Sequence, residues 1–245
     1  MKYSSFTWLH IKKSAGSSTR RILQPHYLIV DKLKFPKCFI QAEKKEYNDI
    51  LNNYRVVLGE YQFKRALFAA TFLYPNTWEK QFSFAFSRNP IDRCISMFHY
   101  LCWNKNQIKP MFLPKQALPT NIENRGDYAS YAFDNFLALN EEARKSPSIY
   151  HPIDNHFTTH TNPMWNDVTD NNGKQLLTRI YRLEHLKKGI NEVYEACNIK
   201  TRIETTGNRF NTRNESINVY MPSAQQKVKI ESIYFNDFEL YEKAH

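Results

Sequence analysis

The stretch FTWLHIKKSAGSS, from Phe6 to Ser18, indicates the architecture of the whole chain. It begins with the aromatic and β-branched residues of a buried strand, and then passes through two lysines into small residues that can begin a helix. A strand, a short loop and a helix in this order present backbone N–H groups to which an anion can bind. Gly16 is one of only six glycines in the chain, and we expect it to let that anion approach. A tight turn whose serines only cap the helix is the alternative interpretation.

Three further runs have the composition of buried strands, and segments with helical periodicity lie between the runs. The four predicted strands are Phe6–Ile11, Arg55–Glu60, Phe82–Arg88 and Thr178–Glu184. This alternation predicts an α/β fold with a central, mainly parallel β-sheet flanked by helices. Ligands of such sheets bind beyond the carboxyl ends of the strands.

Helices with recognisable boundaries follow in the second part of the sequence. Asn89 can cap a helix that has Pro90 at its first position. An amphipathic helix is predicted from Asp127 to about Arg144. Ser223, with a glutamine three residues later, has the form of a capping box and begins a helix that continues to the C-terminus.

Two segments rich in Pro, Asn and Thr are predicted to be loops, at Asn104–Asn124 and Tyr150–Gly173. Loops of this length often recognise the substrate. The chain length is that of one domain, residues 1–245, because domains usually contain ~100–200 residues.

Charge and cysteine content limit the class of protein. The formal net charge of +10 attracts anions such as nucleic acid, a nucleotide cofactor, an acidic polysaccharide or a membrane surface, although a diffuse basic surface is also compatible with it. The four cysteines show neither disulfide nor zinc spacing, which favours reduced thiols. No apolar run reaches ~18 residues and no signal peptide is evident, so we expect a soluble, cytoplasmic chain without an integral membrane segment.

The glycine-rich loop differs from the P-loop of nucleoside triphosphatases. In GxxxxGK[ST] the lysine follows the second glycine, whereas here Lys13 precedes Gly16. The loop LHIKKSAGSST instead resembles the 5′-phosphosulfate loop of the carbohydrate sulfotransferases, whose usual form is IHIPK[TS]AGTS. FSFAFSRNPIDRCISMFHYL resembles the same family's 3′-phosphate motif, an apolar strand followed by RNPxxRxxSxY. Weaker similarity in HFTTHTNPMW, IYRLEHL and IYFNDFELYEK extends the resemblance over nearly the full chain.

This resemblance implies a sulfotransferase fold, similar to that of P-loop nucleoside triphosphatases, and an enzymatic activity. Members of the family transfer the sulfuryl group of 3′-phosphoadenosine 5′-phosphosulfate (PAPS) to a carbohydrate hydroxyl by in-line displacement. No metal is expected to take part. The expected partner is therefore a carbohydrate acceptor.

The resemblance also assigns residues to the donor. Lys13 stands at the position of the family's catalytic lysine and would offset the charge that develops on the leaving phosphate. Arg88 and Ser96 would bind the 3′-phosphate. Arg209 and Asn211, in GNRFNTR, lie where the family has a loop that closes over the nucleotide. Backbone and hydroxyl groups of the first loop would hold the 5′-phosphate: Ser14, Ala15, Gly16, Ser17 and Ser18.

A hydroxyl acceptor also needs a general base. Many relatives place a histidine in a sequence like GHxxY, and this chain reads GEYQF, so Glu60 is our first choice. A buried or salt-bridged carboxylate at a strand end is the alternative. His156, in NHF, matches a histidine that relatives hold near the acceptor, and is the reserve base or an acceptor contact. His151 and His160 lie nearby, but we expect no metal because HExxH spacing is absent.

Two other function classes fit the sequence less well. A nucleic-acid-binding module would use the basic and aromatic residues, but those residues are scattered and no recognised module is present. A nucleotide-dependent kinase would need a Walker lysine and a magnesium-binding aspartate. This sequence has no lysine at the Walker position and no clear aspartate of that kind. In the first loop, Lys12 stands where the family commonly has a proline, and its side chain is predicted to be solvated.

Overall fold

A three-stranded parallel sheet lies at the centre of the computed structural model, which describes residues 3–26, 51, 58–104, 107–108, 125–145, 155–204 and 220–245. The strand order is β1-β2-β5. The strands span Ser5–Leu9 (β1), Gln81–Ser87 (β2) and Arg179–Arg182 (β5). All residues of β2 are buried, because this strand lies in the middle and helices cover both of its faces.

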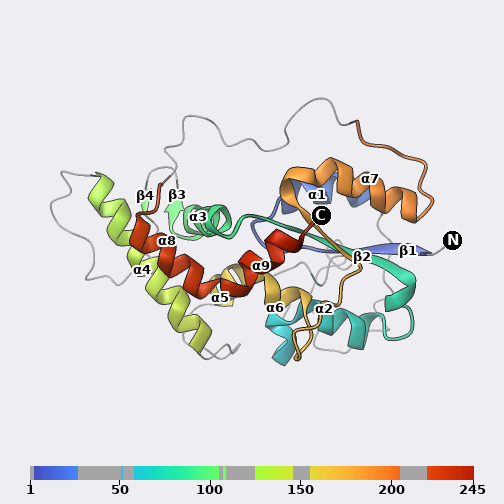
Figure 1. The fold of residues 1–245 in the computed structure, drawn as a ribbon, viewed down its shortest axis with the longest axis horizontal. Helices are drawn as coiled ribbons and strands as arrows, with labels where there is room; N and C mark the ends of the chain where they lie inside the picture. The colour runs from blue at the N-terminus through green and yellow to red at the C-terminus, as the bar shows by residue number, and fades with distance from the viewer. Residues whose placement is uncertain are drawn as a thin grey trace.

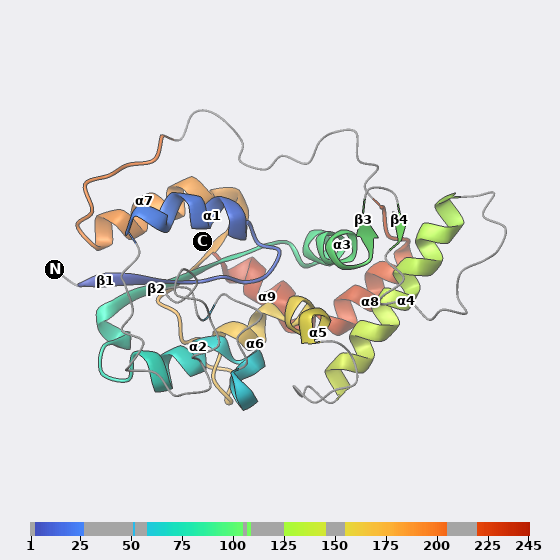
Figure 2. The same ribbon diagram turned by 180° about the vertical axis from the view of Figure 1, so that it is seen from behind.

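Helices on the two faces of the sheet enclose separate hydrophobic clusters. α1 (Gly16–Leu23) and α7 (Leu186–Ala196) cover one face, while α2 (Arg65–Phe68) and α6 (Met164–Val168) cover the other (Figures 1 and 2). Phe84 packs in the cluster on the first face and its neighbour Ala85 in the cluster on the second. This alternation is the two-residue side-chain period of a strand.

A group of helices lies beyond the carboxyl end of β2 (Figure 1). Its members are α3 (Pro90–Leu101), α4 (Arg125–Lys145), α5 (Asn155–Thr161) and α8 (Ala224–Ile233). A third hydrophobic cluster, which includes Phe98, Phe136, Phe157 and Ile230, fills the space between them. A short antiparallel pair, Trp103–Asn104 (β3) and Gln107–Ile108 (β4), follows α3.

The last helix, α9 (Phe235–Lys243), connects this helical group to the sheet (Figure 1). At its end, the His245 N–H donates to the Ile180 carbonyl at 3.0 Å and the Arg182 N–H donates to the His245 carbonyl at 2.8 Å. The C-terminal residue therefore hydrogen-bonds to the backbone of β5. None of the helices within the described ranges has the length and apolarity needed to cross a bilayer.

The structure confirms the α/β fold and most of the predicted elements. The predicted helix starts are confirmed as well: the Asn89 side chain accepts hydrogen bonds at the start of α3, and Ser223 forms a capping box at the start of α8. Among the described cysteines, Cys94, Cys102 and Cys197 are not in disulfide bonds. Cys38 lies outside the described residues.

Three predicted elements differ from the structure. The predicted strand Arg55–Glu60 is wrong at its C-terminal end, because Gly59 has a φ of 59° and begins a 3₁₀ turn over Gly59–Phe63. Residues 55–57 lie outside the described part. Tyr150–Gly173 is not all loop, since it contains α5 and α6. The C-terminal helix is interrupted at Tyr234, which separates α8 from α9.

The threonines of α5 explain why the sequence did not indicate that helix. Thr161 Oγ1 donates to the Phe157 carbonyl at 2.9 Å, and Thr158 Oγ1 donates to the Asn155 carbonyl at 3.1 Å. Threonine is a poor helix former in isolation, but burial and these bonds to the preceding turn stabilise the helix in context.

Candidate functional site

The loop between β1 and α1 has an unusual backbone. Lys13 has a φ of 68° and Ala15 a φ of 56°, so both side-chain-bearing residues adopt the left-handed conformation that favours glycine. Each such residue costs about 1–3 kcal/mol and is typical of a ligand-binding site. A hydrogen bond from the Ser14 N–H to the Ile11 carbonyl at 3.2 Å closes the turn.

Gly16 is required by a contact that the sequence did not reveal. A Cβ at this position would lie 1.8 Å from His10 Nε2, so the imidazole ring occupies the space of a side chain. His10 also stacks on Trp8, with ring centroids 5.1 Å apart. Burial lowers the pKa of His10 well below its usual range, and Lys12 and Arg20 lower it further. The glycine therefore admits the neutral ring of His10, and not only an anion as we expected.

The start of α1 presents backbone N–H groups that have no partner within the helix itself. Its N-cap residue, Ala15, offers no side-chain cap, and the first backbone N–H to bond within the helix is that of Thr19, to the Ala15 carbonyl at 3.0 Å. The N–H groups of Gly16, Ser17 and Ser18 precede it. The Ser14 Oγ is buried and has no hydrogen-bond partner among the described residues. These donors fit an anionic group at the loop.

The start of α3 differs, because the side chain of its N-cap residue, Asn89, accepts hydrogen bonds from the first backbone N–H groups. Asn89 Oδ1 accepts hydrogen bonds from the Ile91 N–H at 3.0 Å and the Asp92 N–H at 3.3 Å. Anion binding at this turn therefore depends on side chains such as Arg88. Ser96 is half-buried in the second turn of the same helix.

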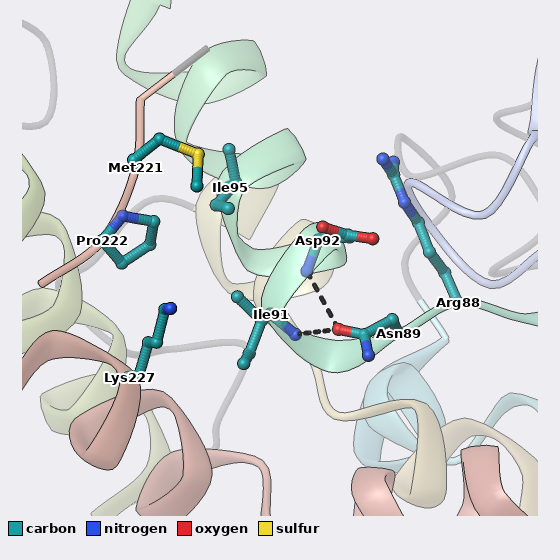
Figure 3. Close-up of a pocket in the computed structure, with 8 residues that line it drawn as sticks. All are labelled: Arg88, Asn89, Ile91, Asp92, Ile95, Met221, Pro222 and Lys227. Atoms are coloured by element: carbon teal, nitrogen blue, oxygen red, sulfur yellow. Dashed lines mark hydrogen bonds between the residues drawn. The ribbon is translucent and has the colours of Figure 1, made fainter. Parts of the chain in front are cut away.

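Arg88 joins the two loops. One of its terminal nitrogens donates to the Lys13 carbonyl at 3.3 Å, so the β1–α1 and β2–α3 connections lie side by side. The arginine also lines a cavity of about 280 Å³ (Figure 3). Apolar atoms of Ile91, Ile95 and Met221 form part of its wall, and Lys227 contributes a second cation. Figure 3 shows Lys227 and Met221 on the other side of Asp92 from Arg88.

Arg93, from the same helix, is buried behind the loop. Its Nε donates to the Lys12 carbonyl at 3.0 Å, and a terminal nitrogen donates to the Asn162 carbonyl at 2.7 Å. The other terminal nitrogen forms a 3.5 Å ion pair with Asp237 of α9. Burial raises the pKa of Asp237, while Arg93 and the backbone N–H groups of residues 164 and 165 oppose that rise.

The side chain of Lys13 lies at a cluster of aromatic rings. Its Nζ is 4.2 Å from the centroid of the Tyr100 ring. Tyr100 stacks on His160 with centroids 5.0 Å apart, and meets the edge of His156 at 5.6 Å. The structure thus brings the predicted residues Lys13 and His156 to one cluster.

The two histidines of this cluster differ in burial. His160 is buried, and burial lowers its pKa to about 2, with a smaller contribution from His156. Its Nδ1 lies 2.8 Å from the His156 carbonyl, and because a carbonyl only accepts, this nitrogen carries the proton of the neutral ring. His156 is half-buried, one turn earlier on α5.

Glu60 is exposed on the 3₁₀ turn Gly59–Phe63, so it is not the buried carboxylate of the alternative interpretation. This turn packs against α5, because Gln62 Nε2 donates to Thr159 Oγ1 at 3.1 Å. Residues Ser14 to Ser18 lie in the connection between β1 and α1 and in the first turn of that helix. Lys12 is buried and not solvated as predicted.

Two residues of the site, Arg93 and Tyr100, are not among those predicted from the sequence. Arg209, Asn211 and His151 lie outside the described residues. Arg93 was present in the quoted motif as its second arginine, which could have identified it. Tyr100 shares a predicted helix face with Asp92 and Ser96, but this four-residue spacing did not indicate a contact with Lys13. Within the described ranges, no group of histidine, cysteine, aspartate and glutamate residues could hold a metal ion.

Comparison with known proteins tests the resemblance. The chain matches the model of the sulfotransferase family over residues 2–244. Comparisons with curated proteins and with solved structures give no match. The family match covers nearly the whole chain and includes both phosphate motifs, which the fold places side by side at the carboxyl ends of β1 and β2. The chain therefore belongs to the sulfotransferase family.

Proposed function

We propose that residues 1–245 form one sulfotransferase domain that transfers the sulfuryl group of PAPS to a carbohydrate hydroxyl by in-line displacement. The observation that carries this proposal is the hydrogen bond from the Arg88 guanidinium to the Lys13 carbonyl at 3.3 Å, in a chain of this family. That contact brings a loop suited to a 5′-phosphate next to an arginine suited to a 3′-phosphate. One nucleotide with a phosphate at each position could bind to both.

The donor site would use backbone and side-chain groups of both loops. The N–H groups at the start of α1, with the hydroxyl of Ser14, would hold the 5′-phosphate. Arg88 and Ser96 would bind the 3′-phosphate, with the arginine providing charge-assisted hydrogen bonds. Arg209 and Asn211 remain candidates for a segment that closes over the nucleotide. When bound, PAPS supplies the sulfuryl group.

Lys13 would act on the leaving group. In-line displacement develops negative charge on the leaving phosphate, and a fixed cation stabilises that charge more in the transition state than in the ground state. The left-handed backbone of Lys13 and its hydrogen bond from Arg88 fix the residue at the loop. Its role is therefore electrostatic.

The general base would come from the α5 side of the loop. Glu60 and His156 are the two candidates, since the turn that carries Glu60 packs against α5 and His156 belongs to α5. His160 does not suit this role, because a group whose pKa is about 2 is a very weak base at neutral pH. Separate Glu60→Gln and His156→Gln variants would distinguish the candidates by the acidic limb of their pH–rate profiles.

The test is transfer of ³⁵S from labelled PAPS to a panel of glycans. We expect label on at least one glycan, almost complete loss of transfer in Lys13→Ala, and normal transfer in the control Lys145→Ala, whose exposed side chain pairs with Glu142. Failure of every glycan to gain label, or unchanged transfer by Lys13→Ala, would refute the proposal. Preferential binding of oligonucleotides, or of ATP with magnesium, would instead favour one of the other two function classes.

A further inference from the structure

We propose that Tyr100 is a positioning residue for Lys13, holding the lysine ammonium over the face of its ring. The inference rests on the proposed function, because that function gives Lys13 its role. The distance of 4.2 Å from Lys13 Nζ to the ring centroid is well inside the range of a cation–π interaction. Lysine has a flexible four-carbon stem, so its charge needs such a contact to stay at one place.

The surroundings of Tyr100 suit this role. Its ring stacks on that of His160, and His160 in turn is fixed by the hydrogen bond from its Nδ1 to the His156 carbonyl. Because burial keeps His160 neutral, the stack places no extra positive charge beside the lysine. The tyrosine thus has a rigid, uncharged support from α5.

Helix α3 contacts the lysine pair at several points along its length. Arg88, just before the helix, donates to the Lys13 carbonyl, and Arg93, in its second turn, donates to the Lys12 carbonyl. Tyr100, in its last turn, contacts the Lys13 ammonium. The continuous segment from Arg88 to Tyr100 therefore contacts both the backbone and the charge of the proposed catalytic residue.

A purely structural role would predict a different set of effects. Tyr100 is 41% exposed, so removing its ring costs little core packing. If Tyr100 only covers the histidines, its replacement should change stability or acceptor affinity and leave the turnover number unchanged. If it positions Lys13, the loss should appear in the turnover number, and a phenylalanine, which keeps the ring face, should rescue it.

The kinetic test compares Tyr100→Leu, Tyr100→Phe and the control Tyr131→Leu, which removes a tyrosine of similar exposure, 43%, from α4. The measured quantity is the conversion of PAPS to adenosine 3′,5′-bisphosphate, with desulfated heparin as acceptor probe and with water alone. We expect Tyr100→Leu to lower the turnover number roughly 2- to 30-fold, as expected for loss of one cation–π contact. Tyr100→Phe should restore most of it, and Tyr131→Leu should match the wild type.

A second measurement does not depend on activity. Lysines are labelled by reductive ¹³C-methylation, and the Lys13 signal is identified by its loss in Lys13→Gln. We expect the ring current of Tyr100 to displace this signal from those of exposed lysines in the wild type and in Tyr100→Phe. In Tyr100→Leu the Lys13 signal should move to the chemical shift of the exposed lysines.

The two measurements separate the possible failures. A Lys13 signal that does not respond to Tyr100→Leu, or a normal turnover number in that variant, overturns the positioning role. A wild-type protein that converts no PAPS under either condition overturns the proposed function, while the Lys13 signal still decides whether Tyr100 holds the ammonium.

Discussion

Replacing Arg93 by methionine should destabilise the protein strongly, because this side chain satisfies several buried groups at once. It is 1% exposed and pairs with Asp237, which is fully buried, at 3.5 Å. It also donates to the carbonyls of Lys12, His160 and Asn162. The substitution keeps most of the volume of the side chain and removes all of its donors.

The size of the effect follows from these partners. Removing one member of a buried ion pair leaves an uncompensated charge and typically costs about 3–5 kcal/mol. Each carbonyl that loses its donor could add about 1–3 kcal/mol, unless water enters to replace it. Taking only the ion pair, we expect the free energy of unfolding to fall by about 3–5 kcal/mol. For a chain of this size, the melting temperature should then fall by about 6–20 °C.

The assay is chemical denaturation with thermal unfolding as a cross-check. Arg93→Met/Asp237→Leu should recover part of the loss, because it removes the stranded carboxylate as well. Lys145→Ala is the matched control, since it breaks an exposed ion pair whose attraction solvent screens. A loss below about 1 kcal/mol in Arg93→Met would contradict a stabilising role of these buried contacts. A double variant less stable than the single one would contradict it as well.

Three further substitutions test other features by melting temperature or denaturation. Gly16→Ala should cost about 1–3 kcal/mol, because its Cβ would meet the His10 ring, and His10→Ala should relieve the clash in the double variant. Asn89→Ala should cost about 1 kcal/mol by removing the cap of α3, and an unchanged stability would contradict that cap. Burial raises the pKa of Asp167 to about 6, above its unfolded value of about 3.9, so the folded state holds the proton more tightly. This group therefore favours folding most below about pH 4, and its contribution is lost as the pH rises to about 6; Asp167→Asn should abolish that decline relative to the wild type.

The central part of the fold could be predicted because its signals are local. Strands β1, β2 and β5 are short runs of aromatic and β-branched residues, and caps such as Asn89 and Ser223 depend only on neighbours within three residues. The phosphate motifs were likewise recognisable as continuous stretches. Their meeting through Arg88 and Lys13 follows from parallel strands whose carboxyl ends lie at one edge of the sheet.

The remainder depends on contacts between distant parts of the chain. No local sequence pattern predicts that Asp237 pairs with Arg93, since the two residues lie 144 positions apart in the chain. Gly16 illustrates the same limit, because the sequence favours a small residue there but does not show that the His10 ring fills the space. The helix α5 was missed because its threonines gain their hydrogen bonds and burial only in the folded protein.

The proposed function claims that one nucleotide carrying 5′- and 3′-phosphates binds between the Lys13 loop and Arg88. The most direct measurement is a calorimetric cycle with adenosine 3′,5′-bisphosphate and adenosine 5′-monophosphate, each titrated into the wild type and Arg88→Ala. We predict that the wild type prefers the bisphosphate by about 1.5–3 kcal/mol, the usual contribution of a hydrogen bond to a charged group, and that Arg88→Ala largely loses this preference. Equal affinity of the wild type for both nucleotides, or a preference that survives in Arg88→Ala, would contradict the claim.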